Sequence, residues 1–338
     1  MNDTRKSQLL SLKLRALVRE HLGRTSDDGL SPAVFARGAA VIDGDSCWVL
    51  VEDQSARGLG PALLWALKEG KRELHVLAES STGVLARQAE YFDFPVSVWH
   101  VDERTLIPAV AEPFIELREP SNEHLDFIEL IERGGAIPVV EHGIVTGEVL
   151  GLEVCRAVND PISGAARLEV GMGAHDREAF ALLHGDKPTV EALAGVVSNV
   201  KLHRRPGALA HPFNRIAPER LLRSAILNDP RLVGATHLEA CDPPFARSNV
   251  LDTVPCVARG TTASGVDLVV VVTSGADPDV VPFALDARAH ADLRFGTNSQ
   301  LLVAMPRSHV TPTNRRALSL ARCEATFVEL DTSAAPPS

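Results

Sequence analysis

Residues 73–101, ELHVLAESSTGVLARQAEYFDFPVSVWHV, have the pattern of a strand, a helix and a second strand joined by short connections. The two ends are rich in apolar and β-branched residues, and Ser81 or Thr82 can cap the helix between them. Two strands joined through a helix by connections this short lie parallel, with a right-handed crossover. The segment therefore predicts an α/β fold built on a parallel or mixed sheet.

The residues before this segment extend the predicted sheet. Residues 39–53, AAVIDGDSCWVLVED, predict a hairpin that turns at residues 43–45, and a helix follows. At the helix start, Gly58 and Gly60 resemble part of a dinucleotide-binding loop, but the third glycine of that fingerprint is missing and Pro61 follows at once. We therefore predict that the two glycines serve a tight turn and close packing of the helix.

The C-terminal part of the chain repeats this order of elements, which predicts an internal duplication at the level of topology. Patterns of strand, strand, helix, strand, helix and strand occur at residues 254–260, 267–275, 277–290, 299–306, 311–323 and 325–330. The predicted fold class is α/β, with parallel or mixed sheets, flanking helices and two similar α/β units around a central α+β hairpin unit. The predicted divisions are residues 1–110 with a helical arm at 7–23, residues 111–240, residues 241–331 and a tail at 332–338.

Composition is typical of an ordinary globular protein. The chain has 338 residues, of which 45% are hydrophobic and 23% charged, and its length suggests about two domains. Its five cysteines are scattered and never spaced CxxC, which indicates neither a disulfide framework nor a zinc knuckle and favours a cytoplasmic location. The net charge of −10 opposes non-specific nucleic-acid binding by the molecule as a whole, although it is compatible with a local basic patch.

The helical arm at residues 7–23 does not have the pattern of a signal peptide, because charged residues interrupt its leucines. Its apolar residues follow one helix face, which we expect to pack on the body of the protein or on a second subunit. A homo-oligomer through this arm is therefore one expectation. No later apolar run reaches the length of a membrane span, so no membrane association is expected.

The central segment, residues 137–185, is the part of the sequence most typical of a site. Residues 151–155 and 167–173 alternate like strands, and turn-forming residues at 159–164 predict an antiparallel hairpin between them. On this pattern Glu153 and Glu169 lie on the same face of the hairpin.

Two like charges on adjacent strands repel each other unless another group holds them together. One arrangement pairs each glutamate with an arginine such as Arg156 or Arg167, as on a solvated sheet face. The other is a metal site, because Mg²⁺ and Mn²⁺ take carboxylate oxygens as ligands. In that case the ligands are Glu153 and Glu169, joined by Glu148 if a bulge turns it inward.

A helix bearing glutamates, a hairpin with an acid on each arm and a following helix resemble the core of PD-(D/E)XK nucleases over about residues 121–201. The resemblance implies a divalent-metal-dependent hydrolase of phosphodiester bonds. In that family a lysine two residues after the last acid helps to orient the attacking water, and here this position is Gly171. An arginine such as Arg156 or Arg167 would have to take its place, although arginine is too basic to accept a proton. The matching acids are Glu129 or Glu132, Glu153 and Glu169.

Residues 201–223 form the one basic tract of this acidic protein, with six basic residues against one acid. Such a tract can follow a phosphate backbone, which makes nucleic acid a predicted partner through Lys201, Arg204, Arg205 and Arg215. It can equally be a solvated connector that docks on the acidic bulk of the protein.

Two function classes follow from the sequence. The first is a metal-dependent, nuclease-like phosphodiesterase, active or catalytically degenerate. The second is a non-enzymatic α/β assembly or regulatory protein that binds a partner or a small ligand. A third and weaker one is a small-molecule enzyme with its pocket at strand carboxyl ends, where open parallel sheets bind ligands. These ends are Glu52-Asp53, Glu79-Ser80, Thr273-Ser274 and Arg307-Ser308.

Overall fold

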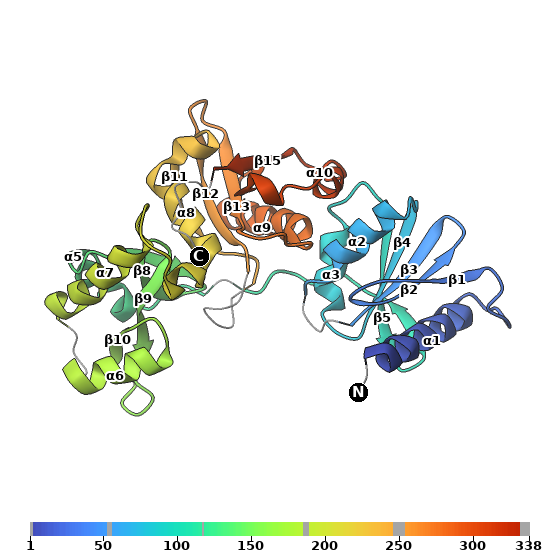
Figure 1. Ribbon diagram of the computed structural model, residues 1–338, viewed down its shortest axis with the longest axis horizontal. Coiled ribbons are helices and arrows are strands. Elements are labelled where there is room, and N and C mark those ends of the chain that lie inside the picture. Colours follow the sequence, from blue (N-terminus) through green and yellow to red (C-terminus); the bar gives the residue numbers. More distant parts are fainter. Residues whose placement is uncertain (1–2, 53–55, 117, 185–188, 246–253, 332–338) are drawn as a thin grey trace. The chain divides into compact units, whose positions relative to one another are not determined.

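The computed structural model describes residues 3–52, 56–116, 118–184, 189–245 and 254–331, which form three sheets flanked by helices (Figure 1). Parallel and antiparallel strands both occur, which confirms the predicted α/β class. The predicted tail at residues 332–338 lies outside the described residues. The chain forms two compact units. The first consists of Met1–Phe114, Ala276–Ala289 and Val310–Thr326, and the second of Ile115–Gly275, His290–His309 and Phe327–Ser338.

The first unit contains a six-stranded sheet whose strands follow one another in chain order. Its centre is parallel, from β3 to β4 to β5, because helices connect these strands as crossovers. Its remaining pairs are antiparallel and include the predicted turn at residues 43–45. The strands are β1 (Leu30–Ala33), β2 (Gly38–Asp43), β3 (Ser46–Val51), β4 (Glu73–Ala78), β5 (Val96–Asp102) and β6 (Thr105–Pro108), and the helices are α1 (Asp3–His21), α2 (Leu59–Lys68) and α3 (Thr82–Ala89).

Helix α1 covers one face of this sheet. Its residues Leu14, Leu17 and Val18 are buried against Trp48 and Leu77. Strands β3 and β4 are almost entirely buried, which explains why their sequences are continuous apolar runs instead of alternating ones. The helical arm thus packs on the body of the protein. Two of its leucines remain exposed on the other side, and the predicted homo-oligomer stays a prediction.

A four-stranded antiparallel sheet, ordered β10-β9-β8-β7, belongs to the second unit. It contains the predicted hairpin, formed by β9 and β10 on either side of the turn at residues 159–164. Helices α5 and α7 cover it through an apolar cluster that includes Ile131, Val145 and Leu193. The elements are α4 (Asn122–Leu125), α5 (Ile128–Arg133), β7 (Ile137–Glu141), β8 (Ile144–Val149), β9 (Leu152–Asn159), β10 (Ala166–Val170), α6 (Ala174–His184) and α7 (Val190–Arg204).

A five-stranded sheet follows in the order β11 to β15. Helix α8 packs on it, with Ile226 in one cluster with Val270 and Leu302. Strand β11 begins before the predicted boundary at residue 241. Only three of its seven residues are buried and they do not alternate, so its sequence lacks the apolar pattern that would predict a strand. The elements are α8 (Pro218–Asn228), β11 (Ala235–Cys241), β12 (Cys256–Thr262), β13 (Asp267–Val272), α9 (Val280–Phe295), β14 (Gln300–Pro306), α10 (Pro312–Leu318) and β15 (Ala325–Leu330), with short 3-10 helices at Pro212–Arg215, Pro230–Val233 and Arg307–His309.

The two α/β sheets share a topology, as the sequence predicts. Strands β1-β2-β3-β4 and β11-β12-β13-β14 each pair as antiparallel, antiparallel and parallel. A helix joins the two parallel strands in each case, α2 in one and α9 in the other. We call β1 to β5 the first repeat and β11 to β15 the second repeat.

Equivalent positions of the two repeats meet within the first unit. Phe92 lies three residues after α3, Ala321 lies three residues after α10, and the two form an antiparallel bridge. Arg322 N–H donates to Tyr91 O at 2.9 Å beside this bridge. Contacts between the same positions of two similar units are the property of an isologous interface. The two repeats therefore share their strand order and also contact each other through equivalent positions.

Close contacts at the two glycines of α2 agree with the predicted packing role. A Cβ atom at Gly60 would lie 2.1 Å from Pro278 O, and one at Gly58 would lie 2.6 Å from a Val51 methyl carbon. The Gly60 N–H instead donates to Asp279 Oδ1 at 2.8 Å. The glycines allow the start of α2 to approach the residues that lead into α9.

Candidate functional site

A β-bulge brings Glu153 and Glu169 to one face of the central hairpin. Gly147 pairs with Cys155 and the next residue, Glu148, pairs with Glu153, so β9 has one extra residue at this point. A bulge changes the alternation of side chains along its strand. Glu153 therefore shares a face with Arg156, and Glu169 lies directly opposite Arg156 on β10.

Arginines pair with both carboxylates. The Arg156 guanidinium donates to Glu153 from Nε at 2.6 Å and from Nη2 at 2.9 Å, and this hydrogen bonding raises the pKa of Arg156. Arg167 Nη2 donates to Glu169 Oε1 at 2.8 Å. Arg177 on α6 lies between them, 3.4 Å from Glu153 Oε1 and 3.3 Å from Glu169 Oε2. Of the two arrangements considered for these glutamates, this is the arginine-paired one.

Glu148 is held by another set of arginines. It is only 5% exposed and contacts Arg220 and Arg223, both from α8. The same two arginines contact Glu141 at the end of β7. This cluster of two acids and two arginines ties α8 to the central sheet and has the character of a structural network. The helix acids Glu129 and Glu132 lie on α5 and are exposed.

The predicted metal ligands do not fit Mg²⁺ or Mn²⁺ as they are arranged. A guanidinium stays charged at any ordinary pH, so a cation would have to displace Arg156 from Glu153 and remain beside its positive charge. The described part of the chain contains no group of three or more His, Cys, Asp and Glu side chains placed to hold a metal ion. Arg156 and Arg167, the predicted substitutes for the missing lysine, are hydrogen-bonded to Glu153 and Glu169.

The basic tract at residues 201–223 is partly internal. Arg204 is fully buried and donates to the backbone carbonyls of three residues around it. Burial lowers its pKa to about 10. A phosphate cannot reach this side chain, so its predicted role in nucleic-acid binding is corrected to a structural one. The other three predicted contacts, Lys201, Arg205 and Arg215, are exposed.

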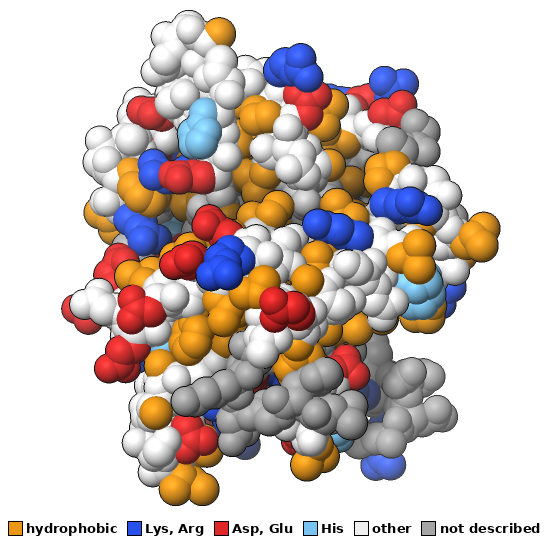
Figure 2. Space-filling view, turned by 90° about the vertical axis from the view of Figure 1, so that its left-hand side faces the viewer, with side chains coloured by type: hydrophobic (Ala, Val, Ile, Leu, Met, Phe, Trp, Pro, Cys, Tyr) orange, Lys and Arg blue, Asp and Glu red, His pale blue; other side chains and the backbone are white. Residues whose placement is uncertain are grey.

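The local charge of the tract overstates the basic surface that it offers. Arg220 and Arg223 are buried with Arg204, so three of the six basic residues serve internal contacts. On the face of the molecule seen in Figure 2, basic side chains are interspersed with acidic and hydrophobic ones. The sequence shows the charges of the tract but not which of them its helices turn inward.

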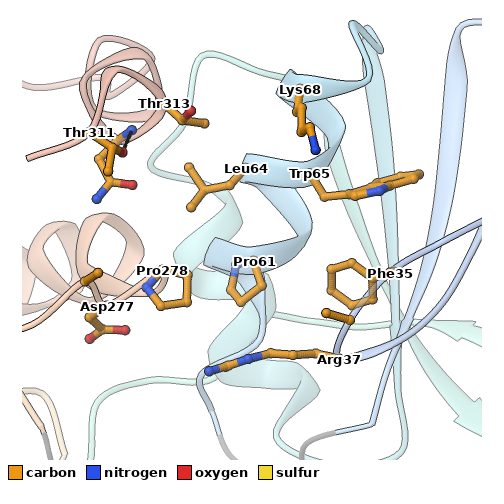
Figure 3. A pocket seen from close by; sticks show the side chains of 13 residues that line it. Phe35, Arg37, Pro61, Leu64, Trp65, Lys68, Asp277, Pro278, Thr311 and Thr313 are labelled. Atoms are coloured by element: carbon orange, nitrogen blue, oxygen red, sulfur yellow. Dashed lines mark hydrogen bonds between the residues drawn. The ribbon is translucent and has the colours of Figure 1, made fainter. Parts of the chain in front are cut away.

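A pocket of about 510 Å³ lies in the first unit, along α2 (Figure 3). Figure 3 shows Pro61, Leu64, Trp65 and Lys68 on that helix, with two further groups of lining residues on either side. One group comes from the connection between β1 and β2, and the other from the residues before α9 and at the start of α10. These residues are Phe35, Ala36, Arg37, Ala276, Asp277, Pro278, Thr311, Thr313 and Asn314.

An ordered aromatic pair forms part of the pocket wall. The rings of Phe35 and Trp65 meet edge to face, with centroids 6.2 Å apart and planes at 71°. Trp65 Nε1 donates to Val34 O at 3.0 Å, which fixes the indole. The rings are thus held in place before any ligand arrives, so a ring bound against them would not have to order them.

Two cations line the pocket. Lys68 is exposed at the last turn of α2 and has no ion-pair partner among the described residues. The Arg37 side chain is 45% exposed, and its Nη1 lies 3.5 Å from Asp279 Oδ2. The carboxylate of Asp277 is paired with Arg57. The available charge in the pocket is therefore positive, in a protein of net charge −10.

Asp279 lies behind Arg37 and is nearly inaccessible. It is 2% exposed, and its Oδ2 atom accepts no hydrogen bond from the described residues. Burial raises its pKa to about 7, with a further contribution from the neighbouring Asp277. Asp277 Oδ1 also accepts a hydrogen bond from the Asp279 N–H at 2.9 Å.

Two smaller cavities lie at the predicted strand ends. Glu52, Glu79 and Ser80 line one of about 380 Å³, and Arg307 and Ser308 line one of about 460 Å³. Their charged groups are neutralised by ion pairs, from Lys6 to Glu52 and from Arg307 to Glu329. Asp53 lies outside the described residues.

Sequence reasoning misses the pocket along α2. Its only local signal is the spacing of Pro61, Leu64, Trp65 and Lys68, which places an aromatic residue and a lysine one turn apart on a helix. An apolar stripe at helical spacing more often indicates a core face.

None of the described helices has both the length and the apolar character needed to cross a membrane. Comparison of the chain with protein-family models, with curated proteins and with solved structures found no match.

Proposed function

We propose that this chain is a non-enzymatic binding protein whose pocket along α2 takes a small anionic ligand that carries an apolar ring. The observation that carries the proposal is an ordered aromatic pair and two cations in one pocket: Phe35 and Trp65, Arg37 and Lys68. Mostly apolar walls with a few placed polar groups are typical of ligand sites, and the volume lies in the range of such pockets.

The two halves of the ligand follow from the two kinds of lining side chain. A planar ring gains most by packing against the fixed ring of Trp65. A carboxylate, sulfonate or phosphate group gains from Lys68, which has no ion-pair partner among the described residues, and from Arg37, which Asp279 only partly neutralises. Because the net charge of −10 repels anions from the protein as a whole, these local cations decide whether an anion binds.

The arrangement of the glutamates favours this class over a metal-dependent phosphodiesterase. Glu153 and Glu169 share Arg177, and Glu148 is held by Arg220 and Arg223. In contrast, the pocket presents Lys68 without a partner in the described part of the chain. A binding site needs groups that a ligand can still satisfy, and the pocket along α2 has them.

Titration of the protein with anilinonaphthalene sulfonate, an anionic dye with fused rings, tests the proposal. We expect saturable dye fluorescence with one site per chain. Lys68→Ala should weaken dye binding by up to about fivefold, the size of one exposed charge contact. Lys71→Ala is the matched control, because Lys71 lies just beyond α2 and outside the lining of the pocket.

Two results would count against the site. Non-saturable dye fluorescence would mean diffuse binding to apolar surface. Equal dye affinity in Trp65→Ala and in the wild type would place the dye elsewhere, provided that the fluorescence of the other two tryptophans shows that the variant is folded. In either case the proposed function falls.

A further inference from the structure

The contact between α2 and α10 is the counterpart of the contact between α9 and α3. Arg87 on α3 lies five residues before Phe92, and Arg316 on α10 lies five residues before Ala321, the two residues of the antiparallel bridge. Each arginine reaches the crossover helix of the other repeat. Arg87 bonds to Asp286 on α9, and Arg316 Nη1 donates to the backbone carbonyl of Leu67 on α2 at 3.3 Å.

Because α2 corresponds to α9 and α10 to α3, the pocket has an equivalent place in the other repeat. The pocket lies where α2 meets the start of α10, so its counterpart lies where α9 meets the start of α3. The pocket is open, whereas the chain itself covers the start of α3. The covering segment is residues 110–115, Val-Ala-Glu-Pro-Phe-Ile, which follow β6.

The covering segment is bound through its backbone, one acidic residue and one aromatic ring. Glu112 N–H donates to Gly83 O at 3.1 Å. Arg87 Nη1 donates to the carbonyl oxygens of Glu112 at 2.7 Å and of Pro113 at 3.3 Å. The Phe114 ring lies over the Arg87 guanidinium, 4.1 Å from its Cζ atom to the ring centroid.

The Glu112 carboxylate lies against the first turn of α3. A Cβ atom at Gly83 would be 2.7 Å from Glu112 Oε2, so glycine at this position allows the side chain to approach the helix. An acid near a helix N-terminus is electrostatically favourable. The covered site therefore takes an extended segment with an acid followed two residues later by an aromatic ring.

We propose that the pocket along α2 binds an extended peptide segment of a partner protein, in which an acidic residue precedes an aromatic residue by two positions. This inference rests on the proposed function, because it names the source of the anionic, ring-bearing group. The residues equivalent to Gly83 and Arg87 are Pro312 and Arg316, both exposed on α10 beside the pocket. The pocket wall adds groups that the covered site does not use, the rings of Trp65 and Phe35 for an aromatic residue and Lys68 for an acid. The chain's own segment is engaged at the start of α3, so the occupant is another protein.

Anisotropy of a fluorescein-labelled peptide with the sequence of residues 110–115 tests the inference on the full chain. We expect saturable binding. Trp65→Ala in the protein and Phe114→Ala in the peptide should each weaken the affinity by about 30-fold or more, as for a central aromatic contact. Glu112→Gln in the peptide and Lys68→Ala in the protein should each cost up to about fivefold, and Lys71→Ala should change nothing.

The outcomes separate the two proposals. If the dye binds at Trp65 and Lys68 but the peptide shows no saturable binding up to millimolar concentration, the peptide inference falls and the small-ligand function stands. If neither binds, both fall. Peptide binding that Trp65→Ala leaves unchanged would place the peptide outside this pocket and would also overturn the inference. The inference is supported if the peptide binds saturably and Phe114→Ala in the peptide weakens the affinity more than Glu112→Gln does.

Discussion

Arg87 and Asp286 form a buried two-point ion pair between α3 and α9, with Nε donating to Oδ1 at 2.8 Å and Nη2 to Oδ2 at 3.0 Å. The Asp286 side chain has no exposed surface. Tyr91 completes the arrangement by donating its hydroxyl hydrogen to Asp286 Oδ1 at 3.3 Å, and the proximity of Asp286 and burial raise the pKa of Tyr91, with burial the larger cause. The contact between the two repeats thus includes an ion pair that is almost completely buried.

Removal of one member of this pair should destabilise the first unit strongly. Asp286→Ala leaves the Arg87 guanidinium buried without its counter-charge, which costs about 3–5 kcal/mol of unfolding free energy. The double variant Arg87→Leu with Asp286→Leu should lose less than Asp286→Ala alone, because no unpaired charge remains. Urea denaturation followed by tryptophan fluorescence measures this, since all three tryptophans lie in the first unit. Equal losses in the single and double variants would contradict the charge argument.

Arg204 and Arg205 provide a matched pair for the basic tract. Arg204 is buried and donates to three backbone carbonyls, so Arg204→Ala should lower the free energy of unfolding of the second unit by at least about 3 kcal/mol. Arg205 is exposed, and Arg205→Ala should change stability by less than about 0.5 kcal/mol. Far-ultraviolet circular dichroism during urea denaturation compares the two. Nucleic-acid binding through the exposed residues of the tract would be seen as a salt-dependent affinity, and Arg205→Ala should reduce both the affinity and its salt dependence if Arg205 contacts a phosphate.

Much of the fold could be predicted because the relevant signals are local. The parallel centre of the first sheet follows from continuous apolar strands joined by short helical crossovers, and the turn at residues 43–45 is fixed by its own residues. The predicted side-chain cap at the start of α3 is absent, because Ser81 occupies the N-cap position without such a hydrogen bond. Strands β1 and β6 are short and mostly exposed, so neither has an apolar alternation that a sequence pattern could detect. They form because their backbones pair with β2 and β5, which are contacts that a local sequence pattern does not show.

The site could be predicted only in part because it depends on long-range contacts. The shared face of Glu153 and Glu169 is reached through a bulge at Val154, which no pattern within β9 reveals. Arg156 and Arg167 lie within the hairpin and could be considered from the sequence, whereas Arg177, which contacts both glutamates, comes from a different element. The pocket along α2 is less local still, because it joins Trp65 and Thr311, which are far apart in the sequence.

Metal addition tests the remaining part of the nuclease hypothesis. Because the predicted ligands are bound to arginines, millimolar Mg²⁺ or Mn²⁺ should leave the Tm of the wild type unchanged. A ligand bound only by the folded state raises Tm by mass action, so a shift would reveal a metal site. The control is the variant with Glu153→Gln and Glu169→Gln. A rise in the wild type that is absent from this variant would restore the metal-dependent phosphodiesterase as the better account.

The last prediction concerns Asp279, whose buried carboxyl group should make the stability of the first unit depend on pH. Burial, and then Asp277, raise the pKa of Asp279 from 3.8 to about 7, while Arg57 and Arg37 oppose the rise. Between these two pH values the folded chain keeps a proton that the unfolded chain has lost. The contribution of Asp279 to stability is therefore full below pH 3.8 and declines as the pH rises towards 7.

Asp279→Asn should remove this decline, because an amide does not titrate and its oxygen can still accept the hydrogen bond from the Gly60 N–H. Relative to the wild type, the variant should gain stability steadily from pH 4 to pH 7 and keep a constant advantage above pH 7. Urea midpoints of tryptophan fluorescence across this range provide the measurement. Asp277→Asn is the comparison variant: it should reduce the decline without removing it, because Asp277 is only the second cause of the raised pKa of Asp279. Parallel pH profiles of the wild type and of Asp279→Asn would contradict this prediction. They would show that the carboxyl group of Asp279 titrates in the folded protein as it does in the unfolded chain, because Arg37 or water compensates for its burial.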